Sequence, residues 1–453
     1  SKVVIVDRKA EYKTGDIFEI QIASYDWKEN KSSFGGDYFV AKLIYEKNNL
    51  YPDGISGAVT DHRNGTYSIR IPLLIPGQAR LEVRLMIPLK GVADLISCTS
   101  SPKYLGTKYV SRYETNETTE CNIDFKFADI PKDKICDYSN PRNQEPWFCI
   151  KPPSGKCPKI TYENFDNRNP PSPLKISIVI MNIGSNRNIL GSPIYVTVSP
   201  ENSKPIQKLP PCATGIGTKA ACGYIVDGVW KSTFCDNKIK QIADAKPCFE
   251  NKEIYFLGDS TTRQHFYFFA QKFGLTAAEA INDDSLWHGP KVATGPGNIR
   301  IYYRAHGLPF QNKGPPGFKP YMSDVLDRIL PGQDEVLIIL NIGLHIMNYE
   351  PSLFVHRMLG IREAMLRLNQ RRDKVRYIYR SHRMLNNTEF GGRNNGWLLY
   401  RYNVIAQQIF QGVENFFYFD VWDFSILWSY KQFHPPQEYL EQESLYLSTS
   451  CTS

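Results

Sequence analysis

The chain has 453 residues, of which 42% are hydrophobic and 22% are charged, and its formal net charge is +8. This length exceeds what a single hydrophobic core serves, so the composition predicts two or three domains. No stretch reaches the roughly 18 uninterrupted apolar residues of a membrane span. The positive charge forms no basic stripe with interleaved aromatic residues, which argues against nucleic acid as a partner.

The cysteines and the glycosylation sequons indicate passage through the secretory pathway. Ten cysteines lie at positions 98, 121, 136, 149, 157, 212, 222, 235, 248 and 451, and Asn-X-Ser/Thr sequons begin at Asn30, Asn64, Asn116 and Asn386. There is no C-x-x-C pair and no histidine at zinc spacing, so disulfides are favoured over a metal site and their pairing stays open. We expect residence in the Golgi lumen or secretion, with any signal peptide or anchor absent from this sequence.

Residues 1 to about 110 read as short strands separated by turn signals. The runs VVIVD, DIFEIQIASYDW, YFVAKLIYE, GTYSIRIPLL and ARLEVRLMIPL alternate or are continuously apolar. This spacing predicts an all-β sandwich without helices.

From about 120 to 210 the chain is rich in cysteine, proline and turn residues, with the strand-like runs KISIVIMNI and SPIYVTVS. We interpret this part as a disulfide-stapled extension of the sandwich whose final strands rejoin the sheet. The prolines of ENSKPIQKLPPC favour an interdomain linker of limited flexibility. The first domain is therefore expected to span residues 1–205.

Residues 206–453 alternate apolar strands with amphipathic helical segments. Strands are expected at EIYFLGDS, EVLIILNIGLH, VRYIYRSH and FFYFDVWDF, and the helical segments lie between them. Near-continuous apolar strands joined by helices predict a parallel, doubly wound sheet covered on both faces.

Ser260 lies where the first of these strands becomes a helix. Gly258 permits a tight turn, and Phe266, Phe269 and Phe273 recur at helical spacing. A hydroxyl at this point would project from the carboxyl edge of the sheet beside unpaired amides, where an oxyanion can be stabilised. The alternative is that Asp259 and Ser260 only cap the helix.

Functional groups in such a sheet follow the carboxyl ends of its strands. This rule selects Asn341 and His345, Arg380 and His382, Asp420 and Asp423, and then His434. His434 is the best base for Ser260, because it follows the last strand and two prolines stiffen its loop; the alternative is a surface histidine. Asn341 could donate its amide to an oxyanion or could instead satisfy strand ends, and His345 and His382 are favoured as structural or substrate contacts over the base.

Several further residues could contact a ligand. Arg263 and His265, early in the helix after Ser260, could bind an anion or could form an ordinary solvated face. Trp287, His288, Arg304, His306, Gly307 and Trp397 are expected in loops that shape a cleft.

The motifs YFLGDSTTRQ, RAHGLP, LNIGLH and DVWDF…HPP together resemble the PC-esterase domain of the NXPE family, the neurexophilin and PC-esterase domain proteins. The runs GGDYFVAKLI, GAVTDHRNGTYSI and CDYSNPRNQEPWFC resemble the neurexophilin-like, immunoglobulin-type region of the same family. The resemblance covers essentially the whole chain. It implies an SGNH-hydrolase-like fold for the second domain, with Ser260 as the nucleophile and His434 as the base.

The same resemblance places Gly307 and Asn341, with the Ser260 amide, where the fold recruits oxyanion donors. The superfamily usually sets its acid three residues before the histidine, a position occupied here by Lys431. Asp423 or Asp420 must then orient His434, or the pair works as a dyad.

Relatives in the wider superfamily move acetyl groups on or off carbohydrate hydroxyls, and NXPE members have been linked to sialic acid O-acetylation. The resemblance therefore implies ping-pong transfer of acetyl from acetyl-CoA to a hydroxyl of sialic acid or a related acidic glycan or glycoprotein, without a metal. Substrate contacts are expected from Arg263, His306, His345, Arg380 and His382. The alternatives are a carbohydrate O-acetyl esterase and a non-catalytic ligand that binds a cell-surface protein through its β-sandwich.

Overall fold

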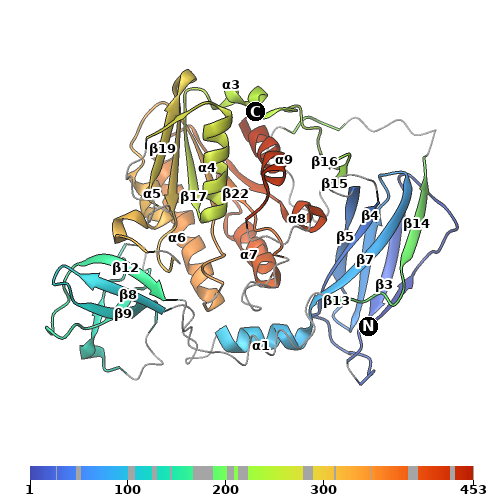
Figure 1. Cartoon of the computed structure of the whole chain (residues 1–453), viewed down its shortest axis with the longest axis horizontal. Coiled ribbons are helices and arrows are strands. Elements are labelled where there is room, and N and C mark those ends of the chain that lie inside the picture. Colours follow the sequence, from blue (N-terminus) through green and yellow to red (C-terminus); the bar gives the residue numbers. More distant parts are fainter. Residues whose placement is uncertain are drawn as a thin grey trace.

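In the part of the chain that it describes, the computed structural model contains three β-sheets, and Figure 1 shows a blue sheet near the N-terminus, a smaller cyan sheet and a central α/β unit. The structure describes residues 1–26, 28–46, 53–99, 108–124, 130–142, 145–166, 187–200, 209–212, 223–278, 289–310, 313–347, 349–385, 396–428 and 434–451.

The first sheet has eleven strands, eight of them in the order β1-β3-β6-β5-β4-β7-β14-β2. β13 pairs with β7, and the hairpin β15–β16 pairs with β5. The strands are β1 (Lys2–Ile5), β2 (Tyr12–Lys13), β3 (Ile17–Ala23), β4 (Tyr38–Tyr45), β5 (Asp53–Asp61), β6 (Thr66–Pro72), β7 (Gly77–Ile87), β13 (Arg187–Asn188), β14 (Ile194–Ser199), β15 (Gly223–Val226) and β16 (Val229–Ser232).

The first sheet has two halves, which β5 joins. Residues 53–57 of β5 pair with β4 in one half, and residues 58–61 pair with β6 in the other. One apolar core lies under both halves. Alternation along β3 buries Phe18, Ile20 and Ile22 in the same cluster as residues of β4 and β7. The period of two therefore produces a sheet-rich N-terminal part, as the sequence predicts.

Two elements of this part differ from the prediction. Residues 53–61 form β5, although none of the strand runs expected from the sequence includes them, because Gly54 and Gly57 read as turn residues. Residues 89–99 form a helix, α1 (Leu89–Thr99), where no helix was expected. Val92 and Ile96 are four residues apart, which is helical spacing, and Val92 is buried.

The cysteine-rich segment forms a separate second sheet in the order β10-β11-β9-β8-β12. Its elements are β8 (Lys108–Tyr113), β9 (Thr118–Asn122), η1 (Lys132–Lys134), β10 (Ile135–Asp137), β11 (Phe148–Ile150) and β12 (Ile160–Asp166). The disulfides Cys121–Cys149 and Cys136–Cys157 staple it. Its strands do not extend the first sheet as expected, because their buried side chains join the core of the α/β unit.

Only part of the expected return to the first sheet can be followed. β14 pairs with β7, as predicted, whereas the run KISIVIMNI and the linker residues 201–208 lie outside the described residues. The domain boundary expected at residue 205 falls within that linker. A third disulfide, Cys212–Cys235, follows it.

The α/β unit is a seven-stranded sheet in the order β18-β19-β20-β17-β21-β22-β23 with its helices. The strands are β17 (Lys252–Gly258), β18 (Thr276–Ala278), β19 (Lys291–Gly295), β20 (Ile299–Ala305), β21 (Glu335–Asn341), β22 (Val375–Arg380) and β23 (Phe416–Phe419). The helices are η2 (Ile242–Ala245), α3 (Lys246–Phe249), α4 (Ser260–Lys272), η4 (Pro296–Asn298), η5 (Pro316–Phe318), α5 (Met322–Arg328), α6 (Pro351–Asn369), α7 (Gly396–Ile409), α8 (Trp422–Trp428), α9 (Gln437–Leu447) and η6 (Ser448–Cys451).

The strands from β20 to β23 run parallel, as expected, while β18 and β19 add an antiparallel edge that was not predicted. Arg304, expected in a loop, lies in β20. β21 is buried along almost its whole length, which explains its continuous apolar sequence. β20 and β21 flank β17 on opposite sides, so the chain order reverses beside the carboxyl end of β17, where α/β sheets bind ligands.

None of the helices in the described part of the chain is long and apolar enough to cross a membrane.

Candidate active site

Ser260 is the first residue of α4, directly after the central strand β17. A Cβ at Gly258 would collide with the Asn341 carbonyl oxygen, so only glycine lets the chain turn here. The Asp259 carboxylate accepts a hydrogen bond of 2.8 Å from the Thr261 amide and caps the helix. The predicted cap is therefore present, and the adjacent serine keeps its own hydroxyl for another partner.

That partner is His434, whose Nε2 lies 2.8 Å from Ser260 Oγ. The two residues are separated by 174 positions in the sequence and meet at the carboxyl edge of the sheet. Ser260 is buried, whereas His434 keeps an exposed surface, so a substrate can approach from the histidine side.

Two arginines act on this Ser260–His434 pair. Partial burial lowers the pKa of His434, and the charges of Arg383 and Arg263 lower it further, while Asp259 opposes them. Both arginines are themselves buried. A lowered pKa keeps His434 neutral near pH 7, the form that can accept the serine proton.

The two aspartates expected to orient His434 have other surroundings. Asp420 Oδ1 accepts hydrogen bonds from the Trp422 amide, at 2.9 Å, and from Ser381 Oγ, at 3.3 Å. Asp423 lies in α8 and lines a pocket against the first sheet. Lys431, at the position where the acid was expected, lies outside the described residues. The carboxylate that raises the pKa of His434 is Asp259 instead.

Asp259 is fully buried and ionised. Burial alone would raise its pKa, but His345, the Thr261 hydrogen bond and Arg380 together lower it to about 2. Its Oδ1 atom accepts both the amide and the hydroxyl of Thr261, at 2.8 and 2.7 Å. The site therefore holds a fixed negative charge one residue from the serine.

Asn341 does not present its amide to the serine as expected. Its Nδ2 donates to the Arg380 carbonyl at 2.7 Å and lies 3.4 Å from His382 Nδ1. Because a carbonyl only accepts hydrogen bonds, the amide orientation is fixed and both N–H groups are used. Asn341 instead joins the ends of β21 and β22, which is the alternative that the sequence left open.

Gly307 follows β20, beside the end of β17. A Cβ at this position would collide with the ring of Tyr321, so no larger residue fits. Its carbonyl accepts hydrogen bonds from His306 Nδ1, at 2.8 Å, and from Arg357 Nη1, at 3.3 Å. These bonds fix the local backbone, and an oxyanion role for the Gly307 amide stays a prediction.

The histidines predicted to contact substrate are buried and paired with protein groups. His306 Nε2 lies 2.9 Å from His345 Nδ1, and burial lowers the pKa of both rings. His382 Nε2 donates to the Ile342 carbonyl at 2.8 Å, and burial lowers the pKa of His382 to about 4. These contacts support the structural alternative over direct substrate binding.

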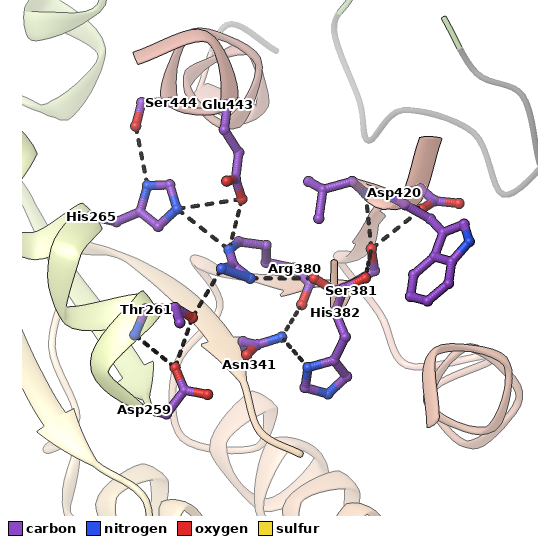
Figure 2. Close-up of polar contacts among 12 residues, drawn as sticks. Asp259, Thr261, His265, Asn341, Arg380, Ser381, His382, Asp420, Glu443 and Ser444 are labelled. Atoms are coloured by element: carbon purple, nitrogen blue, oxygen red, sulfur yellow. Dashed lines mark hydrogen bonds and ion pairs between the residues drawn. The ribbon is translucent and has the colours of Figure 1, made fainter. Parts of the chain in front are cut away.

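Arg380, also expected to contact substrate, is buried and forms a polar clamp with Glu443 and Thr261 (Figure 2). Its Nε lies 2.8 Å from Glu443 Oε1, and its Nη2 donates to Thr261 Oγ1 at 3.0 Å. His265 lies 3.4 Å from the same Glu443 oxygen. The clamp joins β22, α4 and α9, and α9 begins three residues after His434.

Glu443 is the partner that the sequence analysis missed. Burial would raise its pKa, but Arg380 and His265 lower it to about 2. It lies inside an amphipathic helix after the last strand, away from the strand ends that were searched. An acidic residue among the apolar positions of that helix was the available signal.

The described residues do not contain every candidate. Trp287 and His288 lie outside them, and Trp397 lies at the start of α7 in the pocket that Asp423 lines. No group of three or more His, Cys, Asp or Glu side chains in the described ranges could hold a metal ion.

These elements define a disulfide-stapled protein with a sheet-rich N-terminal part and a C-terminal α/β unit carrying a serine–histidine pair. A family model described as NXPE family member 4-like, C-terminal domain, matches residues 230–451. A second model, described as Neurexophilin, matches residues 4–169. The chain belongs to the NXPE family.

One solved structure with weak similarity is invasin, a bacterial integrin-binding protein. The identity is 11% over 66% of this chain and 57% of invasin, so the match spans less than two thirds of that protein. The TM-score of 0.13 is too low to support an argument about fold or function.

Proposed function

We propose that this protein transfers acyl groups through Ser260, most specifically as an O-acetyltransferase with an SGNH-type site. The observation that carries the proposal is the 2.8 Å contact between Ser260 Oγ and His434 Nε2 at the carboxyl edge of a parallel sheet. A nucleophile and a base within hydrogen-bond reach are the minimum for covalent acyl transfer. Membership of the NXPE family supports this class of chemistry.

In the proposed first step, His434 Nε2 takes the proton of Ser260 as Oγ bonds to the acetyl carbonyl carbon. The bond from that carbon to the donor sulfur breaks, and the departing thiolate takes the proton from His434. In the second step, a sugar hydroxyl gives its proton to His434 and attacks the acetyl-serine. Ser260 Oγ then regains the proton.

The start of α4 supplies the proposed oxyanion donors. The first amides of a helix have no intrahelical partner, and the Ser260 amide is the first of α4. The Gly307 amide is the second candidate. Asn341 is not proposed as a donor, since both of its N–H groups are used.

Positive charge favours an anionic donor and acceptor. Arg263 and Arg383 both act on the His434 ring, and the chain carries a net charge of +8. We propose acetyl-CoA as the donor and sialic acid or a related acidic glycan as the acceptor. An immunoglobulin-like character of the first sheet and a Golgi or secreted location belong to the same proposal, and the disulfides among the described residues are consistent with a secretory protein.

We further propose that the pair works as a dyad with Asp259 as its fixed negative charge. Asp259 stabilises the imidazolium that forms when His434 accepts a proton, because the Asp259 charge raises the pKa of His434. Hydrolysis by water at the acetyl-serine would make the same site an esterase.

A non-catalytic secreted ligand is the second candidate function. It is favoured by the neurexophilin match, by the hydrogen bonds of Asp420 to Ser381 and Trp422, and by the position of Asp423 in a pocket against the first sheet. In that case a cell-surface protein would be the partner.

Acetyl transfer by purified variants tests the proposal. Ser260→Ala and His434→Ala should each lower acetylation of a sialylated glycan by about a thousandfold or more. The matched controls Ser154→Ala and His62→Ala change exposed residues remote from α4 and should keep wild-type rates. Full transfer by Ser260→Ala would reject the nucleophile, and absence of transfer and of hydrolysis in the wild type would favour the ligand.

A further inference from the structure

A pocket of about 400 Å³ lies between the first sheet and the α/β unit, apart from the Ser260–His434 pair. Strands β4 and β5 and helix α1 form one side, and the first turns of α7 and α8 form the other. Pockets for small ligands occur preferentially at such junctions between domains. Asp423, which the chemistry above does not use, lines it.

Aromatic rings from both units form one wall. Tyr38 of β4 stacks on Tyr400 of α7, with ring centres 5.8 Å apart and planes at 28°. Trp422 of α8 lies 5.3 Å from Tyr400, and Trp397 lines the same pocket. Flat apolar ring faces beside a polar opening suit a ligand with both apolar and hydroxyl-bearing surfaces.

Carboxylates line the rest of the pocket. Asp37 accepts hydrogen bonds from the Leu89 amide at 2.7 Å and from Ser24 Oγ at 2.5 Å, and Asp61 accepts them from the amides of Gly36 at 2.8 Å and Arg63 at 2.7 Å. Each carboxylate oxygen has two lone pairs, so these bonds position the groups and leave acceptor capacity. With Asp423 there are three carboxylates and one guanidinium, Arg401. This balance disfavours an anionic ligand and favours one that donates hydroxyl hydrogen bonds.

Helix α8, which lines the pocket, belongs to the same sheet edge as the serine. α8 begins shortly after β23 and α4 begins shortly after β17, so both helices begin at the carboxyl ends of parallel strands. β23 lies three strand spacings from β17, roughly 14 Å. An acceptor glycan that reaches both places must therefore be an oligosaccharide.

We propose that this interdomain pocket is an accessory subsite for a neutral hexose or N-acetylhexosamine unit of the acceptor glycan. The apolar face of the sugar ring packs on Trp397 and Tyr400, and its hydroxyls donate to the carboxylates. The proposal deepens the proposed function, because it assumes that the glycan continues to Ser260.

Binding is measured on the Ser260→Ala protein, so that turnover plays no part. The probe is a neutral disaccharide of galactose and N-acetylglucosamine, followed by saturation-transfer NMR and calorimetry. Trp397→Ala and Asp423→Asn, each added to Ser260→Ala, should weaken binding by about tenfold. Tyr195→Ala, an exposed tyrosine on β14 outside the pocket, should bind like the parent.

Trp397→Ala can also lose binding by misfolding, so a second variant is needed. Arg401→Ala changes only an exposed side chain at the rim of the pocket. It should also weaken the disaccharide. Unchanged binding in Arg401→Ala and Asp423→Asn would overturn the proposal, as would no disaccharide binding by the parent or binding only of an arginine-containing peptide. Disaccharide binding that depends on Trp397, without any acetyl transfer in the wild type, would uphold the subsite and reject the proposed function.

Discussion

At the scale of single residues, the proposed mechanism requires a neutral His434 before Ser260 can act. Burial and the charges of Arg383 and Arg263 put the pKa of His434 below its ordinary value of 6.5. The base must be neutral, so kcat/KM should rise as the pH increases through this lowered pKa and stay level above it.

Replacing Arg263 with methionine should move the acid limb of that profile. The substitution removes a charge that disfavours the imidazolium, so the pKa of His434 rises and the limb shifts upward by about half a pH unit. Arg263→Lys keeps the charge and serves as the control. A limb that stays in place in Arg263→Met would show that His434 is not the titrating base.

At the scale of helices and strands, the buried clamp holds α9, and with it the approach of His434, against α4 and β22. Glu443→Gln would leave Arg380 buried without its counter-charge. Breaking such a pair should lower the free energy of unfolding by about 3 kcal/mol. Chemical denaturation measures this loss, and Glu438→Gln, at the start of the same helix, is the control.

The pH dependence of stability provides a second readout for Glu443→Gln. The folded pKa of Glu443, about 2, lies below its ordinary value of 4.5, so its stabilisation is complete above pH 4.5 and is lost as the pH falls toward 2. The stability of the Glu443→Gln protein should therefore not show this part of the decrease as the pH falls. An identical acid profile in variant and wild type would contradict the clamp.

Regular elements of the fold were predictable where one physical signal dominated. The strand before Ser260 and the one before His345 are continuously apolar because both faces are buried, and the structure contains both. β5 was missed because glycines that allow close packing also mark turns. Gly57 of β5 lies so close to β6 that an added Cβ would come within 3 Å of Ile69 and Ile71. The local sequence contains no pattern that indicates this close packing.

The site was predictable only in part. The strand-end rule selected Ser260, directly after β17, and His434, which follows the last strand and α8, and the two side chains meet. The same rule also selected Arg380, His382 and Asn341, because strand ends hold buried polar groups as well as exposed ones. Glu443 was missed because its partner, Arg380, lies 63 residues earlier in the sequence, and only the tertiary structure reveals such a pairing.

At the scale of the whole molecule, the disulfide-bonded second sheet is tied to the loop that carries Gly307. Glu145, beside β11, forms a buried bidentate pair with Arg357 of α6, at 2.9 and 2.7 Å. The same guanidinium donates to the carbonyls of Gly307 and Leu308. The second sheet therefore contributes to the shape of the site.

Glu145→Gln should accordingly affect both stability and transfer. Loss of one buried charge should lower the free energy of unfolding by about 3 kcal/mol, and the freed Arg357 should lower kcat more than it changes KM. Glu363→Gln, which changes an exposed residue of the same helix as Arg357, should change neither. Unaltered kcat in a destabilised Glu145→Gln protein would show that the second sheet stabilises the fold without shaping the site.

The most direct test is to locate the acetyl group on the protein after brief mixing with acetyl-CoA. Peptide mass spectrometry of the quenched wild type should find one acetyl group on Ser260, discharged by added sialylated glycan and absent from Ser260→Ala. Acetyl transfer that proceeds without label on Ser260, or label that persists elsewhere in Ser260→Ala with full turnover, would contradict the account.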